Sequence, residues 1–121
     1  MTTKQLNWKP VVSSLIKLLQ AEKYRVLYVH DGQDYHHYSK RHTLRTTRFK
    51  ASKDICEVDE AYLVVEDLSQ GSGYTLTLFL VLGNSPEEIV SDCSCNARLD
   101  EVLEAFSTFW QGAPCPTKTQ P

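Results

Sequence analysis

The chain has 121 residues, of which 41% are hydrophobic and 23% charged, and its formal net charge is −2. This length and composition fit one globular domain and exclude an intrinsically disordered chain. The sequence has no apolar run near the roughly 20 residues of a membrane span and no N-terminal signal peptide, so we expect a cytoplasmic protein without membrane contact.

The small net charge hides an asymmetry along the chain. Residues 1–53 carry eleven lysines and arginines against three carboxylates, a net charge of +8. Residues 54–121 carry two such cations against twelve carboxylates, a net charge of −10. We expect either that the two halves neutralise each other in the fold or that each half faces a different partner.

Two amphipathic helices are predicted, one near each end of the chain. Apolar residues recur at helical spacing from Trp8 to Leu19, with Asn7 as the expected N-cap and Pro10 in the first turn. A second helix is expected to begin after Asn96 and to end at Gly112. Its apolar stripe consists of Leu99, Val102, Leu103, Phe106, Phe109 and Trp110. Residues 1–112 therefore form one predicted domain, and the proline-containing tail 113–121 is expected to be disordered.

Between the helices the hydrophobic period changes to two, which indicates strands. Strands are predicted over Tyr24–His30, Ala61–Glu66 and Tyr74–Leu82, and a weaker one over Leu44–Lys50. A strand is favoured for the ambiguous segment Glu88–Ser94, although Ser85 and Pro86 before it resemble a helix start. No long crossover separates neighbouring strands, so we expect an α+β fold: an antiparallel sheet of four to five strands with the N-terminal and C-terminal helices packed on one face.

The second face of this sheet is the first candidate site. Two helices of about four turns can cover only one face. Alternation along the strands places Tyr62, Val64, Phe79 and Val81 on the other face. Apolar patches of this kind usually mark an interface, so we predict binding of another protein chain, most simply as a homodimer. The alternative is that residues 33–43 fold back over the patch.

A basic and aromatic segment, His30–Lys53, supports an alternative function. Cations interleaved with aromatic rings suit a nucleic-acid backbone with stacked bases. The residues of this alternative are Lys40, Arg41, Arg45, Arg48 and Lys50, with Tyr35 or Tyr38 as stacking rings. The competing interpretation is a solvated edge strand whose charge the following acidic run neutralises.

Catalysis has the least support. The sequence contains no phosphate-binding or dinucleotide-binding glycine motif, and it predicts no catalytic residue, metal ligand or cofactor. A metal- or thiol-dependent enzyme built on His30, His36 and a cysteine is the weakest alternative. The four cysteines are expected to be reduced thiols that serve as small packing residues. They are Cys56, Cys93, Cys95 and Cys115.

Overall fold

The computed structural model describes residues 8–71, 73–94, 96–114 and 116. Its helices are α1 (Lys9–Ala21), α2 (Leu44–Ile55) and α3 (Ala97–Trp110), with two short 3₁₀ turns, η2 (Leu68–Gln70) and η3 (Pro86–Glu88). Its strands are β1 (Tyr24–His30), β2 (Tyr35–His37), β3 (Glu60–Asp67), β4 (Thr75–Val81) and β5 (Val90–Cys93). The five strands form one sheet in the order β2-β1-β3-β4-β5, and every neighbouring pair is antiparallel.

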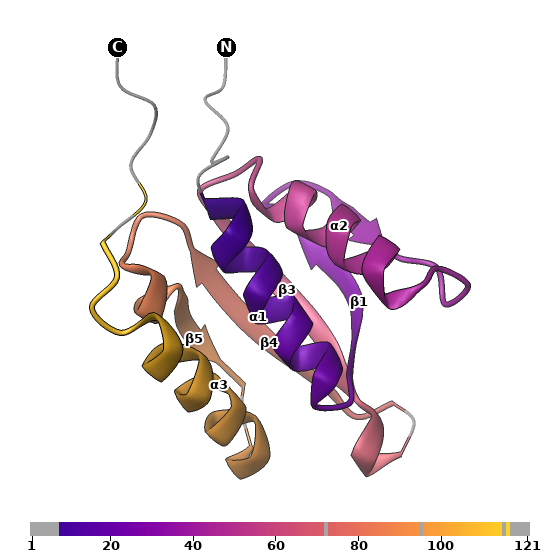
Figure 1. The fold of residues 1–121 in the computed structure, drawn as a ribbon. Helices are drawn as coiled ribbons and strands as arrows, with labels where there is room; N and C mark the ends of the chain where they lie inside the picture. The colour runs from indigo at the N-terminus through magenta and orange to yellow at the C-terminus, as the bar shows by residue number, and fades with distance from the viewer. Residues whose placement is uncertain (1–7, 72, 95, 115, 117–121) are drawn as a thin grey trace.

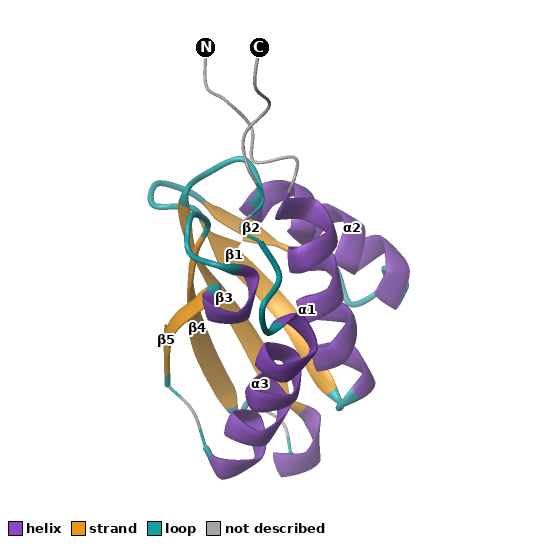
Figure 2. Ribbon diagram, turned by 60° about the vertical axis from the view of Figure 1, so that its left-hand side comes forward, coloured by secondary structure: helices purple, strands orange, loops and turns teal. Residues whose placement is uncertain are grey.

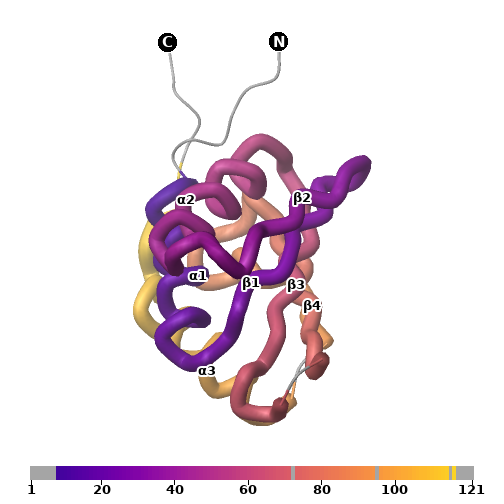
Figure 3. Tube along the Cα trace, turned by 90° about the vertical axis from the view of Figure 1, so that its right-hand side faces the viewer, coloured from indigo at the N-terminus to yellow at the C-terminus, as the bar shows by residue number. Residues whose placement is uncertain are grey.

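All three helices lie on the same face of the sheet (Figures 1 and 2). Figure 3 shows the two layers edge-on, with the helices on one side and the strands on the other. The core lies between the layers, where leucines of β3 and β4 such as Leu63, Leu78 and Leu80 meet Leu15 and Ile16 of α1. The predicted α+β class, with its antiparallel sheet and terminal helices on one face, is confirmed.

The two terminal helices match their predicted ranges closely. Pro10 lies in the first turn of α1, whereas the predicted cap Asn7 lies outside the described residues. The Asn96 side chain caps α3 by accepting a hydrogen bond from the Leu99 amide at 2.8 Å. The predicted apolar stripe of α3 is wrong at one residue, because Phe109 is 77% exposed. The indole of the next residue, Trp110, turns towards α1 and donates to the Ser14 hydroxyl at 3.0 Å, which leaves the Phe109 ring in solvent.

The strand predicted over Leu44–Lys50 is wrong, because this segment forms the first half of α2. The Thr43 side chain caps this helix by accepting from the Thr46 amide at 3.1 Å. The buried residues of α2 are Thr47, Ala51, Ser52 and Ile55, which have helical spacing. Three of the four are small or polar, so hydrophobicity alone does not show the period.

The ambiguous segment before α3 contains both predicted features in succession. Pro86–Glu88 forms the single 3₁₀ turn η3, and Val90–Cys93 forms β5. The Ser85 side chain makes no capping hydrogen bond, so only the proline part of the predicted helix start is present.

The cysteine prediction requires a correction. Cys56 is a free, buried thiol, but Cys93 is disulfide-bonded, so the expectation of reduced thiols is wrong for Cys93. That expectation rested on the compartment alone, and disulfide formation also depends on which sulfur atoms the fold brings into reach. Cys95 and Cys115 lie outside the described residues, as do 117–121 of the predicted disordered tail. Within the described part of the chain, no helix is long and apolar enough to cross a membrane.

Candidate functional site

A continuous row of aromatic rings crosses the sheet face that faces away from the helices, here called the open face. Strand alternation places Tyr28 and His30 of β1 on this face, and the register pairs them with His37 and Tyr35 of β2. On the other side of β1, His30 pairs with Tyr62 of β3, and Tyr62 pairs with Phe79 of β4. We call these six rings the aromatic row: Tyr28, His30, Tyr35, His37, Tyr62 and Phe79.

The rings of the aromatic row touch one another. The ring centroids of Tyr62 and Phe79 are 4.9 Å apart, and those of His30 and Tyr35 are 4.4 Å apart. Tyr28 lies 5.4 Å from Tyr35, and the longest link, from His30 to Tyr62, is 6.3 Å. Tyr35 is 61% exposed and Tyr62 is 44% exposed. The row is therefore a pre-formed aromatic surface that remains accessible to a partner.

The structure places the four residues of the predicted interface on the open face, with unequal access to a partner. Tyr62 and Phe79 lie side by side, and Val81 is half-buried. Val64 is only 6% exposed between its cross-strand neighbours Tyr28 and Thr77. Sequence reasoning missed the rings of β1 and β2, although their alternate spacing was the available signal.

Residues 33–43 do not fold back over the patch, so the alternative prediction for this segment is wrong. Tyr35–His37 pair with β1 as strand β2 and extend the sheet at its edge. No helix among the described residues covers the open face (Figure 2). The aromatic row therefore lies on a sheet face that no other element of the described chain covers.

Because of the strand order, the charge asymmetry along the sequence becomes a difference in charge between the two sides of the sheet. The basic first half forms β1, β2 and α2 at one side of the sheet, and the acidic second half forms β4, β5 and α3 at the other side (Figure 1). On the open face, Asp92 of β5 is paired with Phe79 and marks the acidic edge. His37 of β2 lies at the opposite edge.

The residues proposed for nucleic-acid binding lie on different faces. Arg45, Arg48 and Lys50 belong to α2, on the helix side of the sheet, whereas Tyr35 lies on the open face. Tyr38 is half-buried, and its hydroxyl donates to Asp54 Oδ2 at 2.6 Å; burial and this hydrogen bond raise the Tyr38 pKa. Lys40 and Arg41 are exposed in the loop between β2 and α2. The cations of α2 and the stacking ring Tyr35 are therefore not brought together.

His30 and His36 also lie on opposite faces of their hairpin. His30 belongs to the aromatic row, whereas His36 pairs with buried Val29 and contacts Asp31 through Nε2 at 2.7 Å. The hydrogen bond to Asp31 raises the His36 pKa, and backbone amides of Asp34 and Gln33, together with His36, lower the Asp31 pKa. In the part of the chain that the structure describes, no three His, Cys, Asp or Glu residues form a group that could hold a metal ion.

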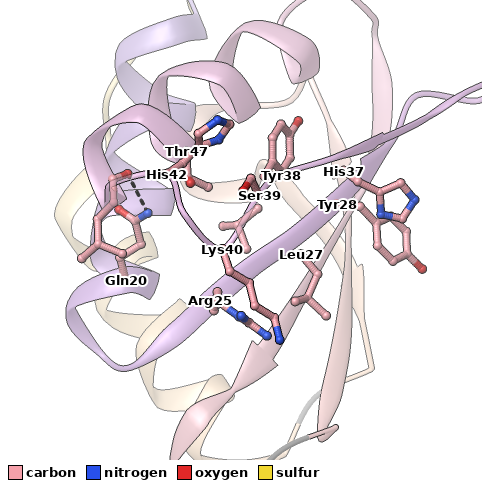
Figure 4. Close-up of a pocket in the computed structure, with 12 residues that line it drawn as sticks. Gln20, Arg25, Leu27, Tyr28, His37, Tyr38, Ser39, Lys40, His42 and Thr47 are labelled. Carbon is pink, nitrogen blue, oxygen red and sulfur yellow. Dashed lines mark hydrogen bonds between the residues drawn. The ribbon is translucent and has the colours of Figure 1, made fainter.

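A cavity of about 390 Å³ opens beside the free edge of β1, between the end of α1 and the loop that leads into α2 (Figure 4). Polar side chains around it include Arg25, Lys40 and His42. We call it the edge cavity. Sequence reasoning did not anticipate it, because its walls depend on α2 being a helix.

These features define an α+β domain with three helices on one face of an antiparallel sheet and an aromatic row on the other. Comparison with protein families, with curated proteins and with solved structures finds no match.

Proposed function

We propose that this protein is a self-associating domain in which the open face of one copy binds the open face of a second copy. The observation that carries the proposal is the aromatic row, which crosses four strands without a covering layer. Aromatic side chains dominate the buried centres of protein interfaces. They lose little conformational entropy on binding when, as here, neighbouring rings already hold them in place.

The area of the face predicts a dimer of modest affinity. Five strands at about 4.8 Å spacing are about 24 Å wide, and a seven-residue strand such as β4 is about 23 Å long. The footprint is therefore on the order of 500 Å² per copy, or about 1,000 Å² in total. Specific interfaces generally bury about 1,200–2,000 Å², so dissociation on dilution is expected.

Charge selects one orientation of the two copies. If the two-fold axis runs parallel to β3, then β2 of each copy lies over β5 of the other, and the basic side meets the acidic side. An in-plane axis perpendicular to the strands would place β2 over β2 and bring like charges together. The cations of α2 lie on the helix side, so this preference for the axis parallel to the strands acts through long-range electrostatics and weakens with salt.

Light scattering after size exclusion tests the proposal. Wild-type protein is expected to be a dimer that dissociates on dilution, and Phe79→Asp is expected to be a folded monomer, because the substitution buries a charge at the interface. The matched control is Phe109→Asp, since Phe109 is an exposed aromatic residue on the helix side. A Phe79→Asp dimer, or a monomeric wild type, would contradict the proposal. A monomer that co-purifies with nucleic acid removable by salt would favour the alternative function.

Cross-linking tests the orientation. His37→Cys lies on β2, and Thr77→Cys lies on β4, both on the open face. With the axis parallel to the strands, a mixture of the two variants should be linked by a short bis-maleimide more efficiently than either variant alone. Efficient linking of His37→Cys to itself would indicate the perpendicular axis and leave the proposed face intact.

A further inference from the structure

The edge cavity exists because β2 is short. Its three residues pair only with Tyr28, Val29 and His30 of β1, so the earlier part of β1 has no neighbouring strand on that side. The chain from Tyr38 to Thr47 passes over this edge and encloses the cavity together with Gln20 of α1 (Figure 4). Its volume of about 390 Å³ falls within the range of small-molecule sites.

One uncompensated positive charge lies at the cavity. The Arg25 guanidinium donates to Glu66 Oε1, and the second oxygen of Glu66 accepts from the Gly73 amide at 2.7 Å. Lys40 also lies near this pair, and Figure 4 shows the nitrogen ends of Lys40 and Arg25 next to each other. Two cations face a single carboxylate, so the local charge favours a monoanion.

Two buried polar atoms of the lining have no hydrogen-bond partner among the described residues. They are Arg25 Nε and His42 Nδ1. Buried polar groups nearly always have a partner, and leaving one without a partner costs free energy. Both atoms are covered by protein, so a ligand in the cavity does not reach them. The cations that it can reach are Lys40 and the Arg25 side chain, which is 28% exposed, and a carboxylate is a strong hydrogen-bond partner for both.

The rest of the lining is largely apolar. Val26 and Leu27 of β1 and Leu44 at the start of α2 contribute aliphatic surface. We propose that the edge cavity binds a small organic monocarboxylate, with its carboxylate between the Lys40 ammonium and the Arg25 guanidinium and its apolar body against these aliphatic side chains. This inference does not depend on self-association through the open face.

A titration of the isotope-labelled full chain, followed by amide NMR shifts, tests the inference. The probes are benzoate and octanoate, with benzyl alcohol as the uncharged comparison. Saturable shifts are expected at residues 25–28 and 38–44 with the carboxylates. Lys40→Gln should weaken carboxylate binding about tenfold, because it removes a charge-assisted contact. Arg45→Gln, the control, removes an exposed cation of α2 outside the lining and should leave the affinity unchanged.

Three results would overturn the inference. The first is the absence of saturable shifts at about 10 mM probe, a concentration that detects even weak binding. The second is equal binding of benzyl alcohol, which would show that the cavity does not select an anion. The third is equal weakening by Lys40→Gln and Arg45→Gln, which would indicate a non-specific effect of charge. Retention of benzoate binding in Phe79→Asp would show that the site is independent of the dimer.

Discussion

An ion pair between the buried Asp67 and the half-buried Arg98 connects α3 to the rest of the fold. The Asp67 side chain is fully buried at the end of β3, and Arg98 Nη2 donates to its Oδ1 at 3.2 Å. Arg98 also donates to the backbone oxygen of Glu22 and to the Ser69 hydroxyl, and its guanidinium lies 4.5 Å from the Tyr24 ring centroid. One side chain therefore joins α3 to the α1–β1 turn and to η2.

Arg98→Met tests this arrangement, since it retains an apolar stem while removing the charge. Removal of one member of a buried pair leaves an uncompensated charge and typically destabilises by about 3–5 kcal/mol. We expect about 3 kcal/mol here, at the lower end, because the Arg98 side chain is 30% exposed and Ser69 still donates to Asp67. This loss corresponds to a fall in Tm of about 10 °C. The control is Arg41→Met, an exposed loop arginine, for which we expect less than about 0.5 kcal/mol.

The pH dependence separates charge from packing. In the native protein, burial acts to raise the Asp67 pKa, but hydrogen bonds from Ser69 and Arg98 outweigh it and hold the pKa below its usual value. In the wild type, the ionised Asp67 carboxylate therefore stabilises the folded protein above about pH 4. This stabilisation is lost as the pH falls through the Asp67 pKa of the folded state, which lies below the pKa of the unfolded state. Without Arg98 the Asp67 pKa rises. The difference in free energy of unfolding between the wild type and Arg98→Met, measured in urea, should therefore become smaller from pH 7 towards pH 4. A difference in free energy of unfolding that is constant over this range would refute the charge argument and show that Arg98→Met destabilises the protein through lost packing.

His36 and the cap of α2 provide the remaining predictions. The His36 pKa, measured by NMR, should lie above its usual value and fall in Asp31→Asn; an unchanged pKa would exclude the Asp31 contact as its cause. The contact of protonated His36 with Asp31 stabilises the folded protein fully below about pH 6.5. This stabilisation is lost as the pH rises through the His36 pKa of the folded state. Thr43→Ala should destabilise by about 1 kcal/mol in urea unfolding, because α2 loses its side-chain cap. Thr43→Ser should have little effect, and equal losses in both variants would show that the hydroxyl does not act as the cap.

The helices and strands that bury hydrophobic side chains are the ones that the sequence predicts correctly. The stripe of α1 and the alternating leucines of β4 both face the core, and their periods differ clearly. The segment that became α2 lacks this signal, because Thr47, Ala51 and Ser52 bury little apolar surface. Its threonines and Phe49 favour a strand locally, and packing against α1 and β1 overrides that preference.

The candidate site was predictable only in part, for a related reason. Tyr62 and Phe79 belong to strands with a clear period, so their common face follows from alternation alone. The alternate spacing of Tyr35 and His37 is visible in the sequence, but it does not show that three residues of β2 pair with β1 and so bring these rings into the row. The edge cavity is still less predictable, since its walls combine β1, a loop and the end of α1.

The charge asymmetry connects the fold with the proposed assembly. If the two halves of the chain had alternated within the sheet, their opposite charges would have been neutralised between neighbouring strands. The order β2-β1-β3-β4-β5 instead separates the first half from the second, with β3 as the central strand. Neutralisation between the halves occurs where they meet at this boundary, as in the ion pair of Arg25 on β1 with Glu66 on β3. In the proposed dimer, a second copy turned about the central strand would balance the remaining lateral asymmetry and would bring the two aromatic rows together.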